Sequence, residues 1–213
     1  KIVCGGGGCV YGALGMSHHA TEDIAILRSL PDVAVICPAD LVEAEEATKA
    51  IVNYPGTVYL RLGRGGEKRI HNKIDNFTIG KSIKVKEGKD VAIFSTGAIF
   101  EEINDALPLL NEAGINPTIY TFPTVKPLDE EVIKEVAKSH SLIVTCEEHN
   151  VVGGFGSAVA EVLSQYNHHA SLLKLGLNDC YTSAVGSQKY LRGLHGLNAE
   201  GISNSILSYF KKR

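Results

Sequence analysis

The chain has 213 residues, of which 44% are hydrophobic and 21% are charged, with 22 Gly, 7 Pro and no Trp. This is ordinary globular composition, which excludes a disordered, collagen-like or fibrous protein. The 24 acidic residues outnumber the 21 Lys and Arg and give a net charge of −3. We therefore expect no nucleic-acid partner, because that would need a broad basic surface. No apolar run reaches the ~18 residues of a membrane span, so we expect no membrane partner.

The five cysteines indicate a reducing compartment. Five is an odd number, and no CxxC pair or Cys/His cluster has the spacing of a zinc site. Buried free thiols are the expected state, and the cytoplasm is the expected location. The chain begins at Lys1 and its single methionine is Met16, so we expect a piece of a longer protein or a processed chain.

Strand-like and helix-like patterns alternate over the first 62 residues. The apolar run 33–36 lies between Pro31 and Pro38, as a buried parallel strand would. Asp40 and Glu43 have the spacing of a capping box, which predicts a helix over residues 41–52. The other elements predicted here are a strand over 2–4, a helix over 21–30 and a strand over 57–62.

Residues 65–90 have no long apolar period and are expected to form a linker or a pair of edge strands. Alternation then resumes, with Gly114 as the predicted C-cap of the first long helix. The predicted strands are 91–94, 115–121, 141–146 and 170–175, and the predicted helices are 99–111, 129–138, 157–166, 188–194 and 199–210. Helices between successive strands indicate parallel βαβ units.

These elements predict an α/β fold with two mostly parallel-sheet α/β units. The first unit is expected to be incomplete, because its few strands would leave an open sheet with an unmatched edge. The second contains enough strands and helices to fold alone, and we expect it to have three layers.

Two glycine-rich turns have some features of phosphate-binding loops. Residues 5–8 are four glycines after an apolar strand, but no Gly-Lys-Ser/Thr follows. Residues 153–156 precede a helix without the GxGxxG spacing, and no acid follows about 20 residues on. A tight strand-to-helix turn or an interface contact is therefore favoured over a nucleotide site.

His18 is the first candidate site residue. It follows the glycine-rich loop and stands with His19, Glu22 and Asp23 just before a helix. A histidine at a helix start can donate a hydrogen bond to an anion or a carbonyl. The alternative is a surface or structural histidine, and the residues alone leave the two interpretations open.

Two arginines, Arg61 and Arg64, lie at the end of a predicted strand. Ligands of open α/β sheets gather at the carboxyl ends of the strands, and two guanidinium groups there would hold a phosphate. A salt-bridged sheet edge is the equal alternative. Glu147, Glu148 and His149 also follow a strand, but adjacent carboxylates on an extended chain face opposite ways and so do not form an acid/base pair.

Several segments carry a resemblance. Gly15-Met16-Ser17-His18 is similar to a Gly-x-Thr/Ser-His segment that precedes a helix ending Leu-Arg-x-Leu-Pro, here residues 27–31, and residues 35–40 are similar to the strand and Pro-x-Asp turn that follow. Similar segments farther along are 80–81, 87–91, 127–129, 147–149, 153–156, 175–179 and 194–202. In this order they resemble the thiamine-diphosphate-dependent transketolase family over essentially the whole chain.

The resemblance implies a domain organisation. Residues 1–66 would be the C-terminal half of the pyrimidine-binding domain, residues 67–87 a linker and residues 88–213 the transketolase C-terminal domain. Thiamine diphosphate and Mg²⁺ would be bound with an N-terminal portion or subunit, not by this chain alone. That portion is an implied partner in a dimer or another homo- or hetero-oligomer.

The resemblance also implies site residues. His18 would be a catalytic residue that contacts the substrate's oxygen, and Arg61 or Arg64 would bind a sugar phosphate. Leu14 stands where the family has an acid in a Gly-Glu-Asp-Gly segment, which weakens the case for a polyhydroxy sugar phosphate as the acceptor. The glutamate that activates the cofactor's aminopyrimidine lies upstream of residue 1 in the family, and no matching motif replaces it here.

The expected function is that of the C-terminal portion or subunit of a transketolase-like enzyme, a transferase that moves a two-carbon ketol unit between sugar-type substrates. The chain alone is expected to be inactive. Two alternatives keep the cofactor, namely 1-deoxyxylulose-5-phosphate synthase and the beta subunit of a 2-oxoacid dehydrogenase. A third is a non-catalytic assembly module.

Overall fold

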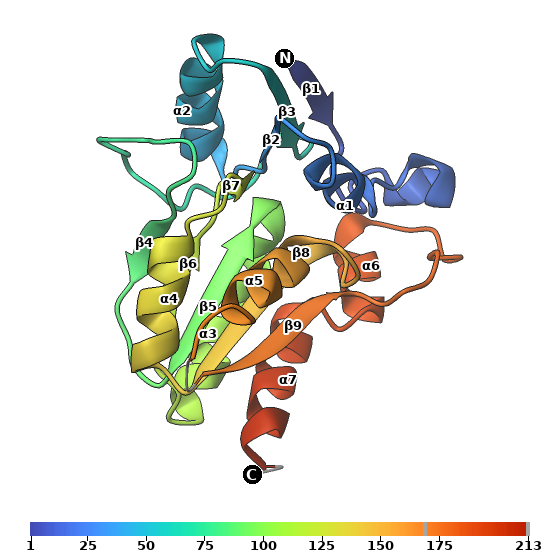
Figure 1. Ribbon diagram of the computed structural model, residues 1–213. Coiled ribbons are helices and arrows are strands. Elements are labelled where there is room, and N and C mark those ends of the chain that lie inside the picture. Colours follow the sequence, from blue (N-terminus) through green and yellow to red (C-terminus); the bar gives the residue numbers. More distant parts are fainter. Residues whose placement is uncertain (168–169, 212–213) are drawn as a thin grey trace.

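Two β-sheets with helices packed against them form the computed structural model, which describes residues 1–167 and 170–211 (Figure 1). The strand order is β1-β3-β2-β7 in the first sheet and β4-β6-β5-β8-β9 in the second. The pairings within these sheets are parallel except those of the edge strands β7 and β4. The predicted fold class, two mostly parallel α/β units, is confirmed.

Three of the four strands and both helices of the first sheet correspond to predicted elements, and the fourth strand, β7, was not predicted. The strands of this sheet are β1 (Ile2–Gly5), β2 (Val33–Ile36), β3 (Thr57–Leu62) and β7 (Thr124–Lys126), and its helices are α1 (Asp23–Arg28) and α2 (Leu41–Val52). The start of α2 is a capped turn, because Asp40 Oδ1 accepts a hydrogen bond from Glu43 N at 2.8 Å. Glu43 reaches back to Ala39 N at 2.7 Å instead of Asp40 N, so the predicted capping box is displaced by one residue.

Two short 3₁₀ helices, η1 (Gly12–Leu14) and η2 (Met16–His18), lie between β1 and α1. They place the segment around His18 at the side of the molecule, next to the connection that leads from β9 to α6 (Figure 1). The Gly186 amide donates a hydrogen bond to Gly12 O at 3.2 Å. Chain segments about 170 residues apart in the sequence are thereby brought together.

The second sheet is larger and its central strands are buried. Its strands are β4 (Ile83–Lys86), β5 (Val91–Thr96), β6 (Thr118–Thr121), β8 (Leu142–Asn150) and β9 (Ser171–Leu177). β4 falls inside the segment 65–90 that we expected to be a linker or a pair of edge strands, and it forms one edge strand antiparallel to β6. β8 runs four residues beyond the predicted strand 141–146.

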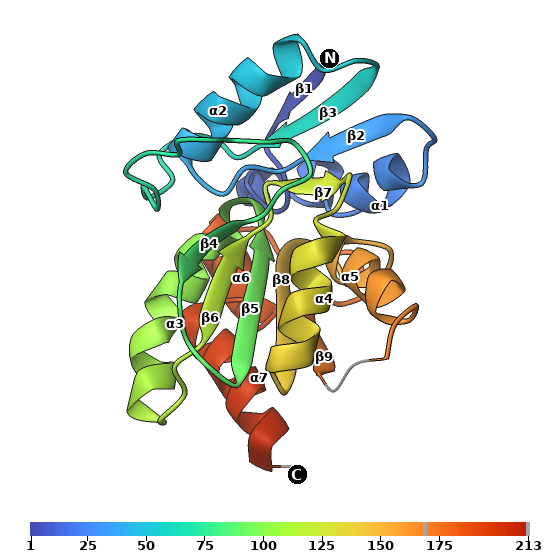
Figure 2. The same ribbon diagram turned by 60° about the vertical axis from the view of Figure 1, so that its left-hand side comes forward.

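Helices cover both faces of the second sheet, which makes the predicted three layers (Figure 2). They are α3 (Phe100–Glu112), α4 (Glu130–Ser139), α5 (Phe155–Leu163), α6 (Gln188–Leu194) and α7 (Ala199–Lys211), with the short η3 (Gly97–Ile99) before α3. Gly114, with φ 79°, follows α3 as its predicted C-cap, and Ile115 N returns a hydrogen bond to Leu110 O.

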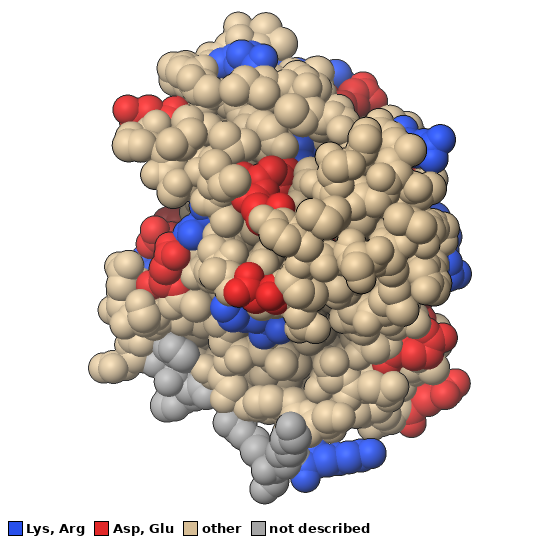
Figure 3. Space-filling model, turned by 90° about the vertical axis from the view of Figure 1, so that its right-hand side faces the viewer, with Lys and Arg blue, Asp and Glu red and all other residues tan. Residues whose placement is uncertain are grey.

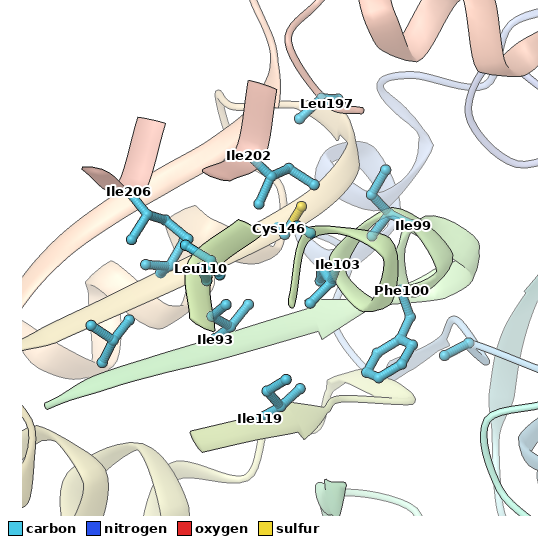
Figure 4. Packing of buried hydrophobic residues seen from close by; sticks show 14 of the residues in the cluster. Ile93, Ile99, Phe100, Ile103, Leu110, Ile119, Cys146, Leu197, Ile202 and Ile206 are labelled. Atoms are coloured by element: carbon cyan, nitrogen blue, oxygen red, sulfur yellow. The ribbon is translucent and has the colours of Figure 1, made fainter. Parts of the chain in front are cut away.

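The core divides according to the alternation of β5. Ile93 faces α3 and α7, where it packs with Leu110 and Ile206 (Figure 4). Phe94 faces α4 and α5, in a second cluster with Phe155. Successive strand residues point to opposite faces, so an unbroken apolar run such as 91–94 is what a strand covered on both faces requires.

The two units share that second cluster. It contains Ile24, Val35 and Tyr59 of the first unit together with Phe122 and Phe155 of the second. The strand β7 comes from the second unit in sequence yet pairs antiparallel with β2 of the first sheet. The structure therefore places a strand of the predicted domain 88–213 in the sheet of residues 1–66.

Within the described residues, no helix combines the length and the apolar character that crossing a membrane requires. The cysteines are all free. Cys9, Cys37 and Cys146 are buried as expected, whereas Cys180 is exposed, because it lies in the loop after β9 and not in an apolar strand.

Candidate functional site

Two adjoining cavities open where β1 and β3 of the first sheet end. Their volumes are about 610 Å³ and 300 Å³, and Arg64, Gly65 and Glu67 border both. The larger one is lined by the segment after β1, the loop after β3, the start of α3 and the start of α6. Carboxyl ends of parallel strands are where open α/β sheets bind ligands, so this is the candidate site.

Arg64 is the cation best placed for a ligand. It is exposed, it lines the larger cavity with Leu14 and Gln188, and its backbone N donates to Glu67 Oε1 at 3.0 Å. Within the part of the chain that the structure describes, its guanidinium forms no ion pair with a carboxylate. A free guanidinium at a cavity wall can bind an anionic group in bidentate fashion.

Arg61, by contrast, is buried and lines neither cavity. Its side chain is 6% exposed, and Nε lies 2.8 Å from Asp23 Oδ2. One terminal nitrogen donates to Ala20 O at 2.7 Å and to Glu148 O at 3.1 Å. The geometry is that of a salt-bridged structural arginine, the alternative that spacing alone left equal to phosphate binding.

His18 lies at the end of η2, four residues beyond Leu14. Its side chain is exposed, and Nδ1 is 3.0 Å from Ser17 Oγ. The cavity is lined by Ala13 and Leu14 of the same segment but not by His18 itself. The neighbouring His19 differs, because its Nε2 is buried without a hydrogen-bond partner among the described residues.

Glu147 and Glu148 point to opposite sides of β8, as adjacent residues of a strand should. Glu147 accepts hydrogen bonds from Phe155 N at 2.6 Å and Gly156 N at 2.8 Å, so it occupies the start of α5. Burial raises the pKa of Glu147 to about 7, against the opposing effect of those two amides. The helix start at the glycine-rich turn 153–156 is thus filled by the chain's own carboxyl group.

Glu148 faces the other way and joins the β1 loop to α6. It accepts from Cys9 N at 2.6 Å, from Gln188 Nε2 and from Arg192, whose nitrogen lies 2.6 Å from Oε2. Arg192 also lies 3.5 Å from Glu102. A Cβ on Gly8 would sit 2.6 Å from Glu148 Oε1, so the close approach explains the glycine there.

His149 links the two units. Its Nε2 accepts from Ala25 N at 3.2 Å, and its Nδ1 lies 2.7 Å from Asn150 O. This pattern requires a neutral ring with the proton on Nδ1, and burial lowers the pKa of His149 accordingly. His149 therefore caps the first turn of α1, since Glu22 makes no side-chain cap.

The glycine-rich segment 5–8 is also bound internally. The amides of Gly6 and Gly7 donate to Leu62 O at 2.9 and 3.0 Å, and Gly8 N donates to Ala20 O at 2.9 Å. These amides are not aimed at an open cradle. In the described chain, no group of three or more His, Cys, Asp or Glu side chains is arranged to hold a metal ion.

Sequence reasoning did not find Glu67, Gln188 or Arg192, which also line the larger cavity. They come from two distant segments, the loop after β3 and α6, and none lies in a motif. The spacing of Gln188 and Arg192 is the one sign of them in the sequence. They are four residues apart in a predicted helix and therefore share one of its faces.

Comparison with known proteins gives two family matches. The model of the transketolase pyrimidine binding domain matches residues 1–66, and that of the transketolase C-terminal domain matches residues 80–202. A protein named putative transketolase C-terminal section from Methanocaldococcus jannaschii is 37% identical, over 100% of this chain and 66% of its own length. A subunit of apulose-4-phosphate transketolase from Phocaeicola vulgatus is 33% identical, over 100% of this chain and 67% of its own length.

A solved structure described as a split gene transketolase, inactive beta4 tetramer, has a TM-score of 0.84 and 34% identity, covering 98% of this chain and 65% of the other. The chain thus spans about two thirds of the length of the relatives it matches. The resemblance seen in the sequence is confirmed by family models that cover nearly the whole chain. The chain belongs to the transketolase family.

Proposed function

We propose that this chain is the C-terminal portion or subunit of a transketolase-like enzyme that transfers a two-carbon ketol unit between sugar-type substrates. Relatives named as a transketolase C-terminal section and as a subunit of apulose-4-phosphate transketolase support this proposal. A relative named 6-deoxy-6-sulfo-D-fructose transketolase subunit, 37% identical, supports it as well. The observation that carries it in this chain is the cavity at the strand ends with Arg64 on its wall.

Arg64 is proposed to bind the phosphate of a sugar phosphate. Of the two candidate arginines, Arg64 is the exposed one on the cavity wall, whereas Arg61 is already paired with Asp23. Leu14 lines the same cavity and offers an apolar surface in place of a carboxylate. The acceptor is therefore expected to present few hydroxyl groups near Leu14, because a hydroxyl against an apolar wall loses its hydrogen bond.

His18 is proposed to contact the substrate's oxygen at the mouth of the site. It is exposed on the segment that also supplies Ala13 and Leu14 to the cavity. With Nδ1 beside Ser17 Oγ at 3.0 Å, Nε2 remains for the substrate. A hydrogen bond from Nε2 would orient the substrate and stabilise charge that develops on its oxygen.

Members of the transketolase family generally use thiamine diphosphate, which supplies the carbanion chemistry when it is bound. The residues described here do not fit the Mg²⁺ and diphosphate part, since no cluster of potential metal ligands is present among them. We therefore assign those groups to the N-terminal portion and assign no residue of this chain to them. The chain alone is expected to be inactive.

The proposed partner surface is an apolar face formed by η1, η2 and the β9–α6 connection. Met16, Tyr181 and Val185 of this face and the adjoining Tyr190 of α6 are each more than half exposed. Figure 3 shows uncharged areas between scattered acidic and basic groups on this side of the molecule. A face of this kind marks an interaction site. We propose that it contacts the N-terminal portion or another subunit in a cytoplasmic oligomer.

The test is reconstitution. The chain is coexpressed with its N-terminal portion, and ketol transfer from ketose phosphates to aldose phosphates is measured with thiamine diphosphate and Mg²⁺. Activity of the complex, with none from either part alone, is expected. Arg64→Ala should raise the KM of the aldose phosphate about tenfold or more, by loss of a charged hydrogen bond. Condensation of pyruvate in place of ketol transfer would instead show 1-deoxyxylulose-5-phosphate synthase activity.

The role of His18 is tested in the same complex. His18→Ala is expected to lower kcat by about 10²-fold while the unfolding midpoint stays the same, because the side chain is exposed. Ser17→Ala is the matched control for the neighbouring hydroxyl and should change kcat far less. An unchanged kcat in His18→Ala would return His18 to a surface role.

A further inference from the structure

The loop that carries Arg64, residues 63–69, has little packing of its own. It leaves β3 after Leu62, and its tip is formed by Gly65 and Gly66 with φ of 94° and 91° and open space around both. The amides of Arg64 and Gly65 donate to Glu67 Oε1 at 3.0 and 3.2 Å, which is a contact inside the loop. Lys68 also forms ion pairs with Glu101 at 3.1 Å and Asp105 at 3.3 Å, both of α3, but its side chain is 59% exposed and such surface pairs contribute little. The position of the loop therefore depends mainly on how its two ends are held.

The near end is held by the first sheet, where Leu62 pairs with Gly5. The far end is held by Asp40. Oδ2 of Asp40 accepts from Ile70 N at 2.7 Å and from His71 N at 2.9 Å, while Oδ1 caps α2. Asp40 is 4% exposed, so these charged hydrogen bonds are shielded from water and are stronger for it.

Glu43 adds a second attachment at the same end. It is fully buried, and its Oε1 lies 2.8 Å from His71 Nε2 and 2.5 Å from Thr121 Oγ1 of the second unit. Burial alone would lower the pKa of His71, but the hydrogen bond and charge of Glu43, with the charge of Asp40, raise it overall. The contact with His71 thus pairs a carboxylate oxygen of Glu43 that is buried away from water.

Capping α2 does not need these contacts. The cap uses Asp40 Oδ1 and Glu43 Oε2, whereas Asp40 Oδ2 and Glu43 Oε1 are directed to residues 70 and 71. Two carboxylates on one helix start therefore hold the helix with one oxygen each and the end of the Arg64 loop with the other. Both cavities border this loop, so any shift of it changes the site.

We propose that Asp40, Glu43 and His71 are positioning residues that clamp the far end of the loop 63–69 and so fix Arg64 for phosphate binding. The part of this proposal that concerns phosphate binding rests on the proposed function. The clamp itself is independent of any substrate. Fixing both ends of a short loop in advance removes the entropy cost of ordering it when the ligand binds.

The experiment uses the assembled enzyme with His71→Ala, His71→Gln and the control Glu45→Gln. Glu45 lies on the same helix as Glu43 but forms its ion pair with Lys49 at the surface, so its variant breaks a contact of α2 outside the clamp. Amide hydrogen exchange of residues 64–71 is followed by mass spectrometry. In parallel, the KM values of glyceraldehyde 3-phosphate and of glyceraldehyde are measured.

His71→Ala should raise exchange in residues 64–71 about tenfold and raise the KM of glyceraldehyde 3-phosphate by a similar factor. The kcat and the KM of glyceraldehyde should change less than about twofold, because only phosphate binding is affected. His71→Gln, which keeps a donor for Glu43, should recover most of both losses. Glu45→Gln should match the parent enzyme.

Unchanged exchange in His71→Ala overturns the clamp, and faster exchange with an unchanged KM overturns its positioning role. A fall in kcat with both acceptors to the same extent also counts against it, because that is the result of general destabilisation. An unchanged KM in Arg64→Ala would instead refute the phosphate assignment in the proposed function. The two failures are distinguishable, since hydrogen exchange reports the clamp without a substrate.

Discussion

Glu147 is a carboxyl group whose protonation changes close to neutral pH. Its pKa is about 7, mainly because it is buried, although two amides at the start of α5 favour the charged form. Just below pH 7 the folded protein therefore holds a proton that the unfolded chain has already lost. Its immediate neighbour His149 is held neutral, with Nδ1 3.6 Å from Glu147 Oε2.

This raised pKa predicts a pH dependence of stability. Between pH 4.5 and about 7 the folded state binds more protons at Glu147 than the unfolded state, so this residue's contribution to the free energy of unfolding falls as pH rises. The fall amounts to about 3 kcal/mol over that window. Glu147→Gln removes it, so the variant's stability relative to the parent should rise with pH.

The measurement is urea denaturation of both proteins at several pH values from 5 to 8. Glu112→Gln is the control, because Glu112 is exposed near the end of α3 and should leave the pH profile of the parent unchanged. His149 acts in the opposite direction, since its lowered pKa destabilises the folded state at acid pH. A constant difference between Glu147→Gln and the parent across the range would contradict the prediction.

At the residue scale, the sequence could predict that two arginines lie at the end of a strand. It could not show which of them binds a ligand and which is a structural residue. Arg61 and Arg64 differ in environment because Asp23, the partner of Arg61, lies 38 residues away in the chain. The opposite orientation of Glu147 and Glu148, in contrast, was predictable from strand geometry alone. Roles that depend on distant partners, such as that of His71 with Glu43, could not be read from spacing.

At the element scale, strong local signals predicted boundaries well. The helix α2 covers residues 41–52, as the capping-box spacing predicts, and β2 occupies the apolar run between Pro31 and Pro38. The strand β7 was not predicted, because three residues carry no usable period and its partner β2 lies about 90 residues earlier. β8 extends through polar residues, since Glu147 and Glu148 are satisfied by tertiary contacts that no local pattern shows.

The packing at the start of α5 requires a residue without a side chain at position 154, which is Gly154. A Cβ on Gly154 would lie 2.1 Å from Glu147 Oε2 and 2.6 Å from His149 Nδ1. Both groups are buried and cannot move without losing the hydrogen bonds that start α5 and α1. Gly154→Ala should therefore destabilise the protein by about 2–4 kcal/mol.

Gly193 in α6 provides the matched control. It is exposed, nothing lies within 4 Å of its Cβ position, and its φ is not positive. Gly193→Ala should stabilise the protein by about 0.5–1 kcal/mol, because alanine loses less backbone entropy in a helix. Thermal unfolding of the two variants checks the predicted loss of stability in Gly154→Ala and the predicted gain in Gly193→Ala. A Gly154→Ala protein as stable as the parent would show that the start of α5 can shift.

On the scale of the whole molecule, the two units are joined by three kinds of contact. β7 completes the first sheet, the apolar cluster around Phe122 and Phe155 draws residues from both units, and Arg61 connects them through polar groups. The alternating patterns of the sequence predict two units. They could not predict this joint, because each contact pairs residues that are far apart in the chain.

The joint around Arg61 predicts that both sheets lose stability together. Arg61→Leu leaves Asp23 with Tyr59 OH, at 2.7 Å, and without its cation. It also leaves Ala20 O and Glu148 O without a donor that spans the two units. Removing one partner of a buried pair costs about 3–5 kcal/mol. Hydrogen exchange in mild denaturant should therefore accelerate by similar factors in β1–β3 and in β5–β8.

Arg28→Leu is the control for that experiment. Arg28 also spans the units, but its partner Glu161 is 61% exposed, so its removal should cost less than about 1 kcal/mol. Equal effects of the two variants would contradict the assignment of the joint to the buried arginine. Acceleration confined to β1–β3 in Arg61→Leu would show that the second sheet is stable without the first. Acceleration in both would mean that the walls of the Arg64 cavity, which come from both units, form and unfold together.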